Sequence, residues 1–257
     1  MSTYRGGRHE HGQNFLTDRK TIAKLVRLVA ETKGPILEIG AGSGAITLEL
    51  QELGRPITAV EIDGTLVDRL KPRVDDSVLV VHEDFLNWRL HPSTSVIVGN
   101  LPFHLTTAML RRILHSNTWT DAVLLVQWEV ARRRGGVGGA TMMTAQWWPW
   151  IEFSLEGRVP AAAFKPRPSV DGGLLRMRRR PEPLVSRKQR KAYNRFVHAV
   201  FTGRGRGLHS ILQRTVEPSA RNNVQRVLAE ERIVSSMLPK DLNAQQWVTL
   251  FAASRTN

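Results

Sequence analysis

The sequence predicts an α/β fold in which a mostly parallel sheet is covered by helices on both faces, followed by a small all-helical domain. Two observations carry this prediction. Short apolar runs alternate with amphipathic segments over the first 150 residues, and such alternation builds a parallel sheet through right-handed crossovers. Beyond residue 181 only helical periodicity remains. We therefore expect one domain at 1–180 and a second at 181–257.

The elements of the first domain follow in order. Thr17 and Asp18 precede apolar residues at helical spacing, which indicates a capped helix that ends near residue 34. The strand-like runs lie at 36–39, 57–62, 78–81, 95–98 and 122–126, and helical stretches lie between them at 45–53, 66–70 and 106–114. Alternating runs at 153–159 and 173–178 predict two late strands at an antiparallel edge. The sheet should then have seven strands.

The composition is that of an ordinary globular protein. Hydrophobic residues make up 41% of the 257 residues and charged residues 23%. No apolar stretch approaches the roughly 20 residues needed to cross a bilayer, and the first residues lack the apolar core of a signal peptide. The chain has no Cys, and its eight His show no metal-ligand spacing. We expect a cytoplasmic protein without a membrane partner or a metal site.

The net charge of +14 is unevenly distributed and indicates a polyanionic partner. Residues 1–100 hold 12 basic and 13 acidic side chains, so the remaining residues carry about +15. A GC-rich genome would explain why 29 Arg outnumber 8 Lys, but it would not explain the scarcity of acidic residues. Between Arg176 and Arg206 there are eleven basic residues and one acidic residue, Glu182. We therefore expect nucleic-acid binding.

The candidates for RNA contacts come from two basic segments. They are Arg132, Arg133, Arg134, Arg176, Arg178, Arg187, Lys188, Arg190, Lys191, Arg204 and Arg206. For the first three a solvated helix face is an alternative explanation. The tryptophans at 147, 148 and 150 could form an RNA-stacking platform, but aromatic residues at this density more often fill a core. We expect them to be core residues.

A glycine-rich turn, Gly40-Ala41-Gly42-Ser43-Gly44, follows the first strand-like run. Glycine lets the backbone adopt positive φ angles and approach a ligand closely. Glu61 ends the second run 21 residues after Gly40, where a carboxylate can accept hydrogen bonds from both ribose hydroxyls, and Ile62 follows it. These residues predict a pocket for an adenosine-type cofactor. Two alternatives remain, the looser dinucleotide fingerprint of an NAD-dependent oxidoreductase and a tight turn without a ligand.

Asp84 and Phe85 follow the third strand-like run. At that position a carboxylate could accept the hydrogens of the cofactor's adenine amine, while Phe85 packs near the ring. A plain helix N-cap at Asp84 is an equal alternative.

The most discriminating motif is Asn100-Leu101-Pro102-Phe103, after the fourth run. An adenine amine is a poor nucleophile because its lone pair is delocalised into the ring. Oxygen acceptors at the Asn100 side chain and at the Leu101 or Pro102 carbonyl could hold both amine hydrogens and turn the lone pair toward a methyl donor. Phe103 offers a stacking face for a flipped base. The alternative is a surface Asn-x-Pro turn with a buried Phe.

Six motifs occur in the same order as in the ribosomal RNA adenine N6-methyltransferases, which the sequence resembles over nearly all of residues 11–178. They are His11-Gly12-Gln13-Asn14-Phe15-Leu16, Glu38-Ile39-Gly40-Ala41-Gly42-Ser43-Gly44, Val60-Glu61-Ile62-Asp63, Glu83-Asp84-Phe85, Asn100-Leu101-Pro102-Phe103 and Phe164-Lys165-Pro166-Arg167-Pro168-Ser169-Val170. The resemblance implies a Rossmann-like fold that uses S-adenosyl-L-methionine. It also implies that Gln13, Asn14 and Leu16 line the cofactor pocket and that Phe164 borders the target base.

Within that superfamily, the stretches 127–132, 138–141 and 147–150 look like those of the erythromycin-resistance (Erm) methylases, as does His104 after Phe103. This resemblance implies methylation of one adenine in the peptidyl-transferase loop of 23S rRNA, which blocks macrolides, lincosamides and streptogramin B. Many relatives carry Tyr where this chain has Phe103, so stacking survives and any phenolic hydrogen bond is lost.

The expected partner is 23S rRNA, free or in a partly assembled large subunit, and we expect a monomer. Three alternatives remain open: a small-subunit (16S) rRNA dimethyltransferase, an NAD-dependent oxidoreductase and a non-enzymatic RNA-binding factor.

Overall fold

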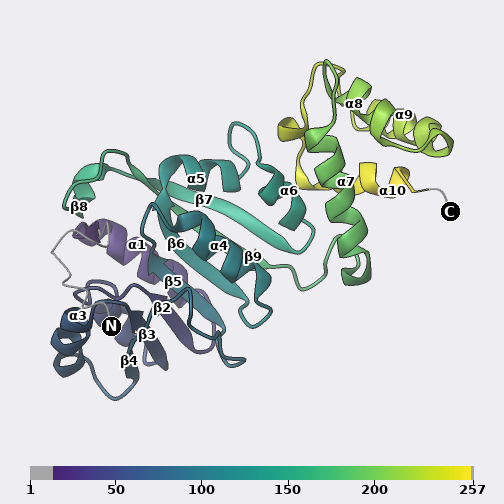
Figure 1. Ribbon diagram of the computed structural model, residues 1–257. Helices are drawn as coiled ribbons and strands as arrows, with labels where there is room; N and C mark the ends of the chain where they lie inside the picture. Colours follow the sequence, from purple (N-terminus) through teal and green to yellow (C-terminus); the bar gives the residue numbers. More distant parts are fainter. Residues whose placement is uncertain (1–13, 256–257) are drawn as a thin grey trace, which may run out of the picture. The chain divides into compact units, whose positions relative to one another are not determined.

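In the computed structural model, which describes residues 14–255, seven strands form one sheet in the order β4-β3-β2-β5-β6-β9-β7 (Figure 1). The strands are β2 (Ile36–Ile39), β3 (Ile57–Glu61), β4 (Val78–His82), β5 (Val96–Asn100), β6 (Asp121–Gln127), β7 (Ile151–Val159) and β9 (Gly172–Arg179). A second, two-stranded sheet pairs β1 (Phe15–Leu16) antiparallel with β8 (Phe164–Lys165). The predicted seven-stranded sheet is confirmed.

The strand directions place a ligand crevice at the centre of the sheet. Strands β2 to β6 are parallel, and β9 runs antiparallel to β6, as the late alternating run predicts. The chain moves outward from β2 through β3 and β4, then returns to the other side of β2 with β5 and β6. In open sheets, ligands bind beyond the carboxyl ends of the strands at such a reversal.

In residues 14–134, five helices accompany the strands: α1 (Arg19–Ala30), α2 (Thr47–Gln51), α3 (Gly64–Leu70), α4 (Thr106–His115) and α5 (Trp128–Arg134). Helix α1 begins where the sequence predicts, because the Asp18 carboxylate accepts hydrogen bonds from the Thr21 amide (2.8 Å) and hydroxyl (2.6 Å). These bonds, the hydroxyl first, lower the pKa of Asp18 below its usual value. In residues 14–255, no helix is long and apolar enough to cross a membrane.

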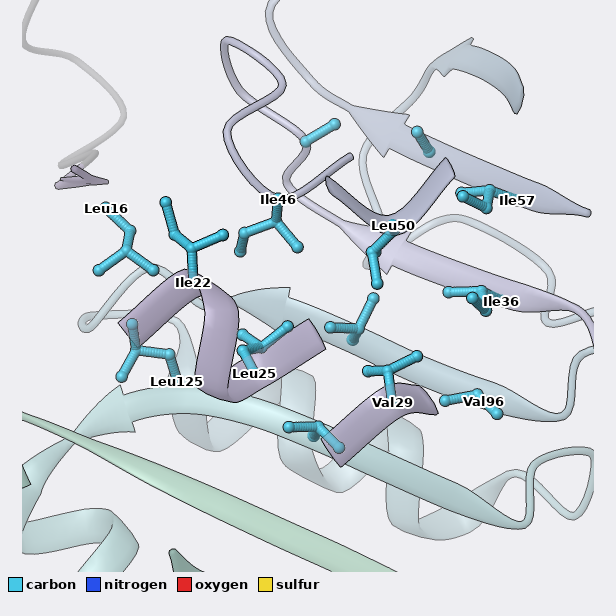
Figure 2. Packing of buried hydrophobic residues seen from close by; sticks show 14 of the residues in the cluster. Leu16, Ile22, Leu25, Val29, Ile36, Ile46, Leu50, Ile57, Val96 and Leu125 are labelled. Carbon is cyan, nitrogen blue, oxygen red and sulfur yellow. The ribbon is translucent and has the colours of Figure 1, made fainter. Parts of the chain in front are cut away.

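A hydrophobic core lies between α1 and the sheet. Leu25 and Val29 of α1 are fully buried, and Figure 2 shows Val29 beside Val96 of β5. Ile36 of β2 is paired in register with Ile57 of β3 and Val96 of β5, so the same face of three neighbouring strands is apolar. Strands buried in this way read as continuous hydrophobic runs.

The contacts within the chain divide it into two compact units. The sheet unit contains residues 14–131 and 155–178, and the helical unit contains residues 132–154 and 179–255. The helical unit includes α6 (Met142–Trp147), α7 (Arg190–Thr202), α8 (Leu208–Thr215), α9 (Arg221–Glu230) and α10 (Ala244–Ala253). Single-turn 3₁₀ helices lie at Lys71–Arg73, Ala161–Ala163, Arg187–Gln189, Pro218–Ala220 and Pro239–Asp241.

The helical unit starts earlier in the sequence than the predicted boundary near residue 180. Residues 132–154, assigned by the sequence to the first domain, pack with the later helices. Tyr193 of α7 explains the difference. Its hydroxyl donates to the Ala145 carbonyl (3.0 Å), and its ring contacts Trp150 and Phe251 edge to face at 5.6 and 5.2 Å. The three neighbouring tryptophans are buried, as expected for a core: Trp147, Trp148 and Trp150.

Gly99 on β5 tests the close packing at the centre of the sheet. A Cβ atom at this position would lie 2.5 Å from the Ile39 carbonyl oxygen of β2, where neither backbone can yield. We expect Gly99→Ala to lower the free energy of unfolding by about 3 kcal/mol in urea titrations. The control is Gly54→Ala, which adds its Cβ in open space at φ +60° and should cost only about 1 kcal/mol. Equal losses for both variants would contradict the packing argument.

Candidate active site

The glycine-rich turn after β2 has the backbone that the sequence predicts. Gly40, Gly42 and Gly44 all have positive φ angles, of 71°, 57° and 86°. A Cβ at Gly44 would lie 2.5 Å from a methyl group of Leu70. Glycine is therefore required both by conformation and by space, and the turn exposes backbone at the carboxyl end of β2.

Glu61 fastens this turn to the end of β3. Its Oε2 accepts a hydrogen bond from the Gly42 N–H (2.7 Å), and its Oε1 accepts one from the Asp63 N–H (2.9 Å). The carboxylate is only 2% exposed, yet it lines a pocket. Each carboxylate oxygen has a second lone pair, so both can still accept a hydroxyl of a ligand.

Asp84 caps a turn, not a helix, and its contact with the cofactor's adenine stays a prediction. Its Oδ1 accepts a hydrogen bond from the Leu86 N–H (2.8 Å), which stabilises the turn after β4. No described residue donates to its Oδ2, and the side chain lines the same pocket. Phe85 lies beside it, 3% exposed, with the Arg112 guanidinium 5.9 Å from its ring centroid. One carboxylate oxygen is thus structural and the other is available to a ligand.

The side-chain amide of Asn100 is held in one orientation. Its Nδ2 donates a hydrogen bond to the backbone carbonyl of Asn14 (2.7 Å). A carbonyl oxygen can only accept, so the NH₂ group must face Asn14 and the Oδ1 atom must face away from it. No described residue donates to that oxygen. The loop itself is anchored by the Leu101 N–H, which donates to the Leu125 carbonyl of β6 (2.9 Å).

The sequence leaves the Leu101 and Pro102 carbonyls as alternative acceptors, and the structure distinguishes between them. The Pro102 carbonyl accepts from the Leu105 N–H (3.0 Å) and from the Thr106 hydroxyl (3.2 Å), so the first turn of α4 occupies it. Among the described residues, none donates to the Leu101 carbonyl. Leu101 therefore supplies the free acceptor next to Asn100.

Phe103 lines the pocket, whereas Phe164 does not. The two rings meet edge to face, with centroids 6.0 Å apart and planes at 73°. Phe164 lies on β8 and is 1% exposed. In this structure Phe164 packs against Phe103, and its predicted place beside the target base stays a prediction.

The N-terminal segment lies over the glycine turn. Asn14 and Phe15 line the pocket, and a Cβ at Gly42 would lie 3.1 Å from the Phe15 ring. Leu16 is 3% exposed and its side chain belongs to the core, so its predicted place at the cofactor pocket stays a prediction. Successive side chains of a strand point to opposite faces, and the alternation in β1 selects Phe15. Gln13 lies outside the described residues.

A single pocket unites these elements. The space between its lining residues and the open solvent at its mouth together amount to about 850 Å³. The predicted residues that line it are Asn14, Gly40, Gly42, Glu61, Ile62, Asp84, Phe85, Asn100, Leu101, Pro102 and Phe103. The sequence did not point to Phe15, Glu83, His104, Leu105 and Met109, which also line it. The glycine turn and the Asn100 loop therefore face one space.

Glu38 of β2 is a buried carboxyl group close to this pocket. It is 1% exposed, and among the described residues none completes a hydrogen bond to its oxygens, although the Thr47 hydroxyl lies near enough to affect it. Burial raises the pKa of Glu38 to about 8; the Thr47 hydroxyl opposes this shift, and the charge of Glu61 adds to it. The group therefore holds a proton at neutral pH, although it begins the glycine-rich motif.

Two of the predicted RNA-contacting arginines are structural instead. Arg176 is 8% exposed and forms an ion pair with Glu31 (2.6 Å). Arg134 is 7% exposed and donates to the Thr144 hydroxyl (3.2 Å). Both side chains are committed to partners within their own unit. Seven of the remaining candidates are exposed: Arg133, Arg178, Arg187, Lys188, Lys191, Arg204 and Arg206. Arg132 and Arg190 are partly buried.

Comparisons with known proteins identify a matching family and several similar proteins. The family model described as ribosomal RNA adenine dimethylase matches residues 5–255. An rRNA adenine N-6-methyltransferase of Corynebacterium diphtheriae is 58% identical over 215 residues, covering 83% of this chain and 85% of that protein. The mycinamicin-resistance protein MyrB of Micromonospora griseorubida is 47% identical over 251 residues, covering 97% and 80%. The crystal structure of the 23S rRNA methyltransferase ErmE matches with a TM-score of 0.86 at 33% identity, covering 93% and 99%.

Glu38 predicts a characteristic pH dependence of stability. Between pH 4.5 and about 8 the unfolded chain loses this proton while the folded chain keeps it, so stability falls as pH rises through that window. The loss is up to about 1.4 kcal/mol per pH unit. Glu38→Gln removes this titrating group. The free energy of unfolding of the variant relative to that of the wild type, measured in urea, should therefore increase from pH 5 to pH 8. The exposed Glu49→Gln is the control, and parallel pH profiles for all three proteins would refute the burial argument.

Proposed function

The chain belongs to the ribosomal RNA adenine dimethylase family, and from this premise we propose that it transfers methyl groups from S-adenosyl-L-methionine to N6 of one adenine in 23S rRNA. The observation that carries the proposal is the shared pocket: Glu61 and Asp84 line one part of it, and the free oxygen of Asn100 belongs to the same space. Modification of that adenine in the peptidyl-transferase loop would confer resistance to macrolides, lincosamides and streptogramin B.

The proposal of large-subunit specificity is supported by the most similar relatives. The relative that is 47% identical is named for resistance to mycinamicin, and the structure with a TM-score of 0.86 is that of a 23S rRNA methyltransferase. The substrate would be 23S rRNA, free or in a partly assembled large subunit. The enzyme would act in the cytoplasm as a monomer.

The residues present fit S-adenosyl-L-methionine. Glu61 retains lone pairs for ribose hydroxyls, and Asp84 Oδ2 can accept from an adenine amine. Ile62 and Phe85 supply apolar walls for the adenine ring, and the glycine turn leaves room for the remainder. When bound, this cofactor supplies a methyl group activated by a positively charged sulfur.

In the proposed mechanism the protein orients the target amine. Asn100 Oδ1 and the Leu101 carbonyl each accept one N6 hydrogen, which turns the nitrogen lone pair toward the methyl donor. The cofactor would supply the methyl group to the nitrogen held in this way, and the surplus amine proton would leave to water. Positive charge that develops on N6 is stabilised by the same two oxygens. Phe103, supported by Phe164, stacks on the flipped base.

RNA binding would rely on charge and on an unpaired target. Proteins read looped or flipped bases more easily than the narrow groove of A-form RNA. The positive charge of about +15 in residues 101–257 supplies a sequence-independent attraction to the backbone. The family assignment argues against the oxidoreductase and against a purely RNA-binding factor. A small-subunit substrate remains the alternative to be tested.

The direct test is to incubate the purified chain with labelled S-adenosyl-L-methionine and rRNA from each subunit, then to map the modified base by primer extension. We expect label at one adenine of the peptidyl-transferase loop of 23S rRNA. Label confined to 16S rRNA would overturn the large-subunit assignment, and no transfer to either RNA would overturn the activity.

Asn100 and Glu61 should separate catalysis from cofactor binding. We expect Asn100→Ala to reduce kcat by about 100-fold or more, because one of two preorganised acceptors is lost. Its affinity for S-adenosylhomocysteine, measured by calorimetry, should stay within about twofold. For Glu61→Ala we expect the main effect on cofactor binding, with the affinity reduced about tenfold or more. Wild-type turnover in Asn100→Ala would remove the catalytic role assigned to this residue.

A further inference from the structure

Three arginines of the helical unit lie near enough to affect one another's charge, and one of them contacts the buried tryptophans. Arg190, at the start of α7, places its guanidinium 4.0 Å from the ring centroid of Trp147 and 5.8 Å from that of Trp150. The backbone brings Arg179 to the same place, since the next residue donates its N–H to the Trp150 carbonyl (2.9 Å). Arg187 lies in the 3₁₀ turn that leads into α7. We propose that Arg179, Arg187 and Arg190, the arginine triad, bind a backbone phosphate of the substrate RNA.

The arginine triad concentrates positive charge in one part of the helical unit. Burial, followed by the charges of Arg187 and Arg190, lowers the pKa of Arg179 to about 10. Among the described residues, no carboxylate forms an ion pair with Arg187 or Arg190. The acidic side chain of Glu152 is engaged by Arg180 (2.6 Å). Like charges held together in this way favour an anionic ligand.

Helix stability does not explain the placement of these cations. Helix α7 has no acidic residue in its first turn, and its N-cap residue Gln189 makes no side-chain cap hydrogen bond. Arg187, Lys188, Arg190 and Lys191 all lie at this end, where the helix dipole disfavours positive charge. Because basic residues at the N-terminal end of α7 lower the stability of the fold, the binding of an anion explains their placement better than helix stability does.

The chemistry of the triad selects a phosphate group. A guanidinium stacked on an indole keeps its edge N–H groups available, and these match the oxygens of a phosphodiester in a bidentate pair. The stacking on Trp147 holds Arg190 in place, so little side-chain freedom is lost on binding. Because the proposed substrate is rRNA, this inference rests on the proposed function. It adds a defined RNA site in the helical unit, while the methyl-transfer pocket belongs to the sheet unit.

The test compares Arg187→Gln and the double variant Arg179→Gln/Arg187→Gln with the control Arg226→Gln. Arg187 is exposed, so its replacement should leave the thermal unfolding midpoint unchanged. Arg226 lies on α9 of the same unit with a side chain 69% exposed, and its replacement removes the same charge elsewhere. The measurements are RNA affinity at several salt concentrations, KM and kcat for methylation, and calorimetric affinity for S-adenosylhomocysteine.

For Arg187→Gln we expect about tenfold weaker RNA binding and a smaller salt dependence, by about one unit of slope. KM for RNA should rise in parallel, while kcat at saturating RNA and cofactor affinity stay at wild-type values. The double variant should bind RNA more weakly than Arg187→Gln does. Because a phosphate contact is independent of sequence, an unrelated hairpin of equal length should lose the same factor.

The Arg190→Lys variant tests whether a loss of RNA binding comes from misfolding. It keeps the positive charge and removes the planar guanidinium group. It should weaken RNA binding while the protein stays folded by circular dichroism. RNA affinities of the triad variants equal to that of Arg226→Gln would overturn the phosphate site. A loss confined to the cognate RNA would also overturn it, because that result indicates base recognition. If the wild-type chain methylates neither rRNA, the proposed function fails first, and the two failures are thereby distinguished.

Discussion

The hydrogen bond from the Asn100 amide to the Asn14 carbonyl decides what the pocket can do. Without it, the amide could present either its NH₂ group or its oxygen, and an NH₂ group would repel the hydrogens of a target amine. With it, only the oxygen remains for a ligand. Asn14 precedes β1, which pairs with β8, and β8 carries the Phe164 ring that supports Phe103. One short strand pair therefore positions both the acceptor and the stacking face.

Two buried glutamates near the glycine turn have different roles because their surroundings differ. Glu61 receives two backbone N–H groups and fastens the turn to β3, so its negative charge is compensated. Glu38 receives none and holds a proton instead. The charged carboxylate is the one that lines the pocket, and the neutral one fills the sheet behind it. The carboxylate fixed by backbone N–H groups is therefore the one placed where a ligand hydroxyl can meet it.

Local signals allowed most of the fold and much of the pocket to be predicted. Continuous apolar runs identified the parallel strands, and Asp18 marked the start of α1. Information that depends on tertiary packing was not available in the same way. Phe15 and Leu16 are both apolar, and only the β1–β8 pairing decides which side chain faces the pocket. The ion pair that commits Arg176 joins residues 145 positions apart, so its basic neighbourhood misleadingly indicated RNA contact. Tyr193 likewise gathers residues 145–150 into the helical unit across a long loop.

The most direct measurement is the crystal structure of the chain bound to S-adenosylhomocysteine and to an RNA hairpin that carries the target adenine. The account predicts that Asn100 Oδ1 and the Leu101 carbonyl oxygen each lie about 3 Å from N6 of the flipped base, within hydrogen-bond range. The Asn100 NH₂ group should still donate to Asn14. An adenine held in the pocket by other groups, or an Asn100 amide turned with its nitrogen toward N6, would contradict the account.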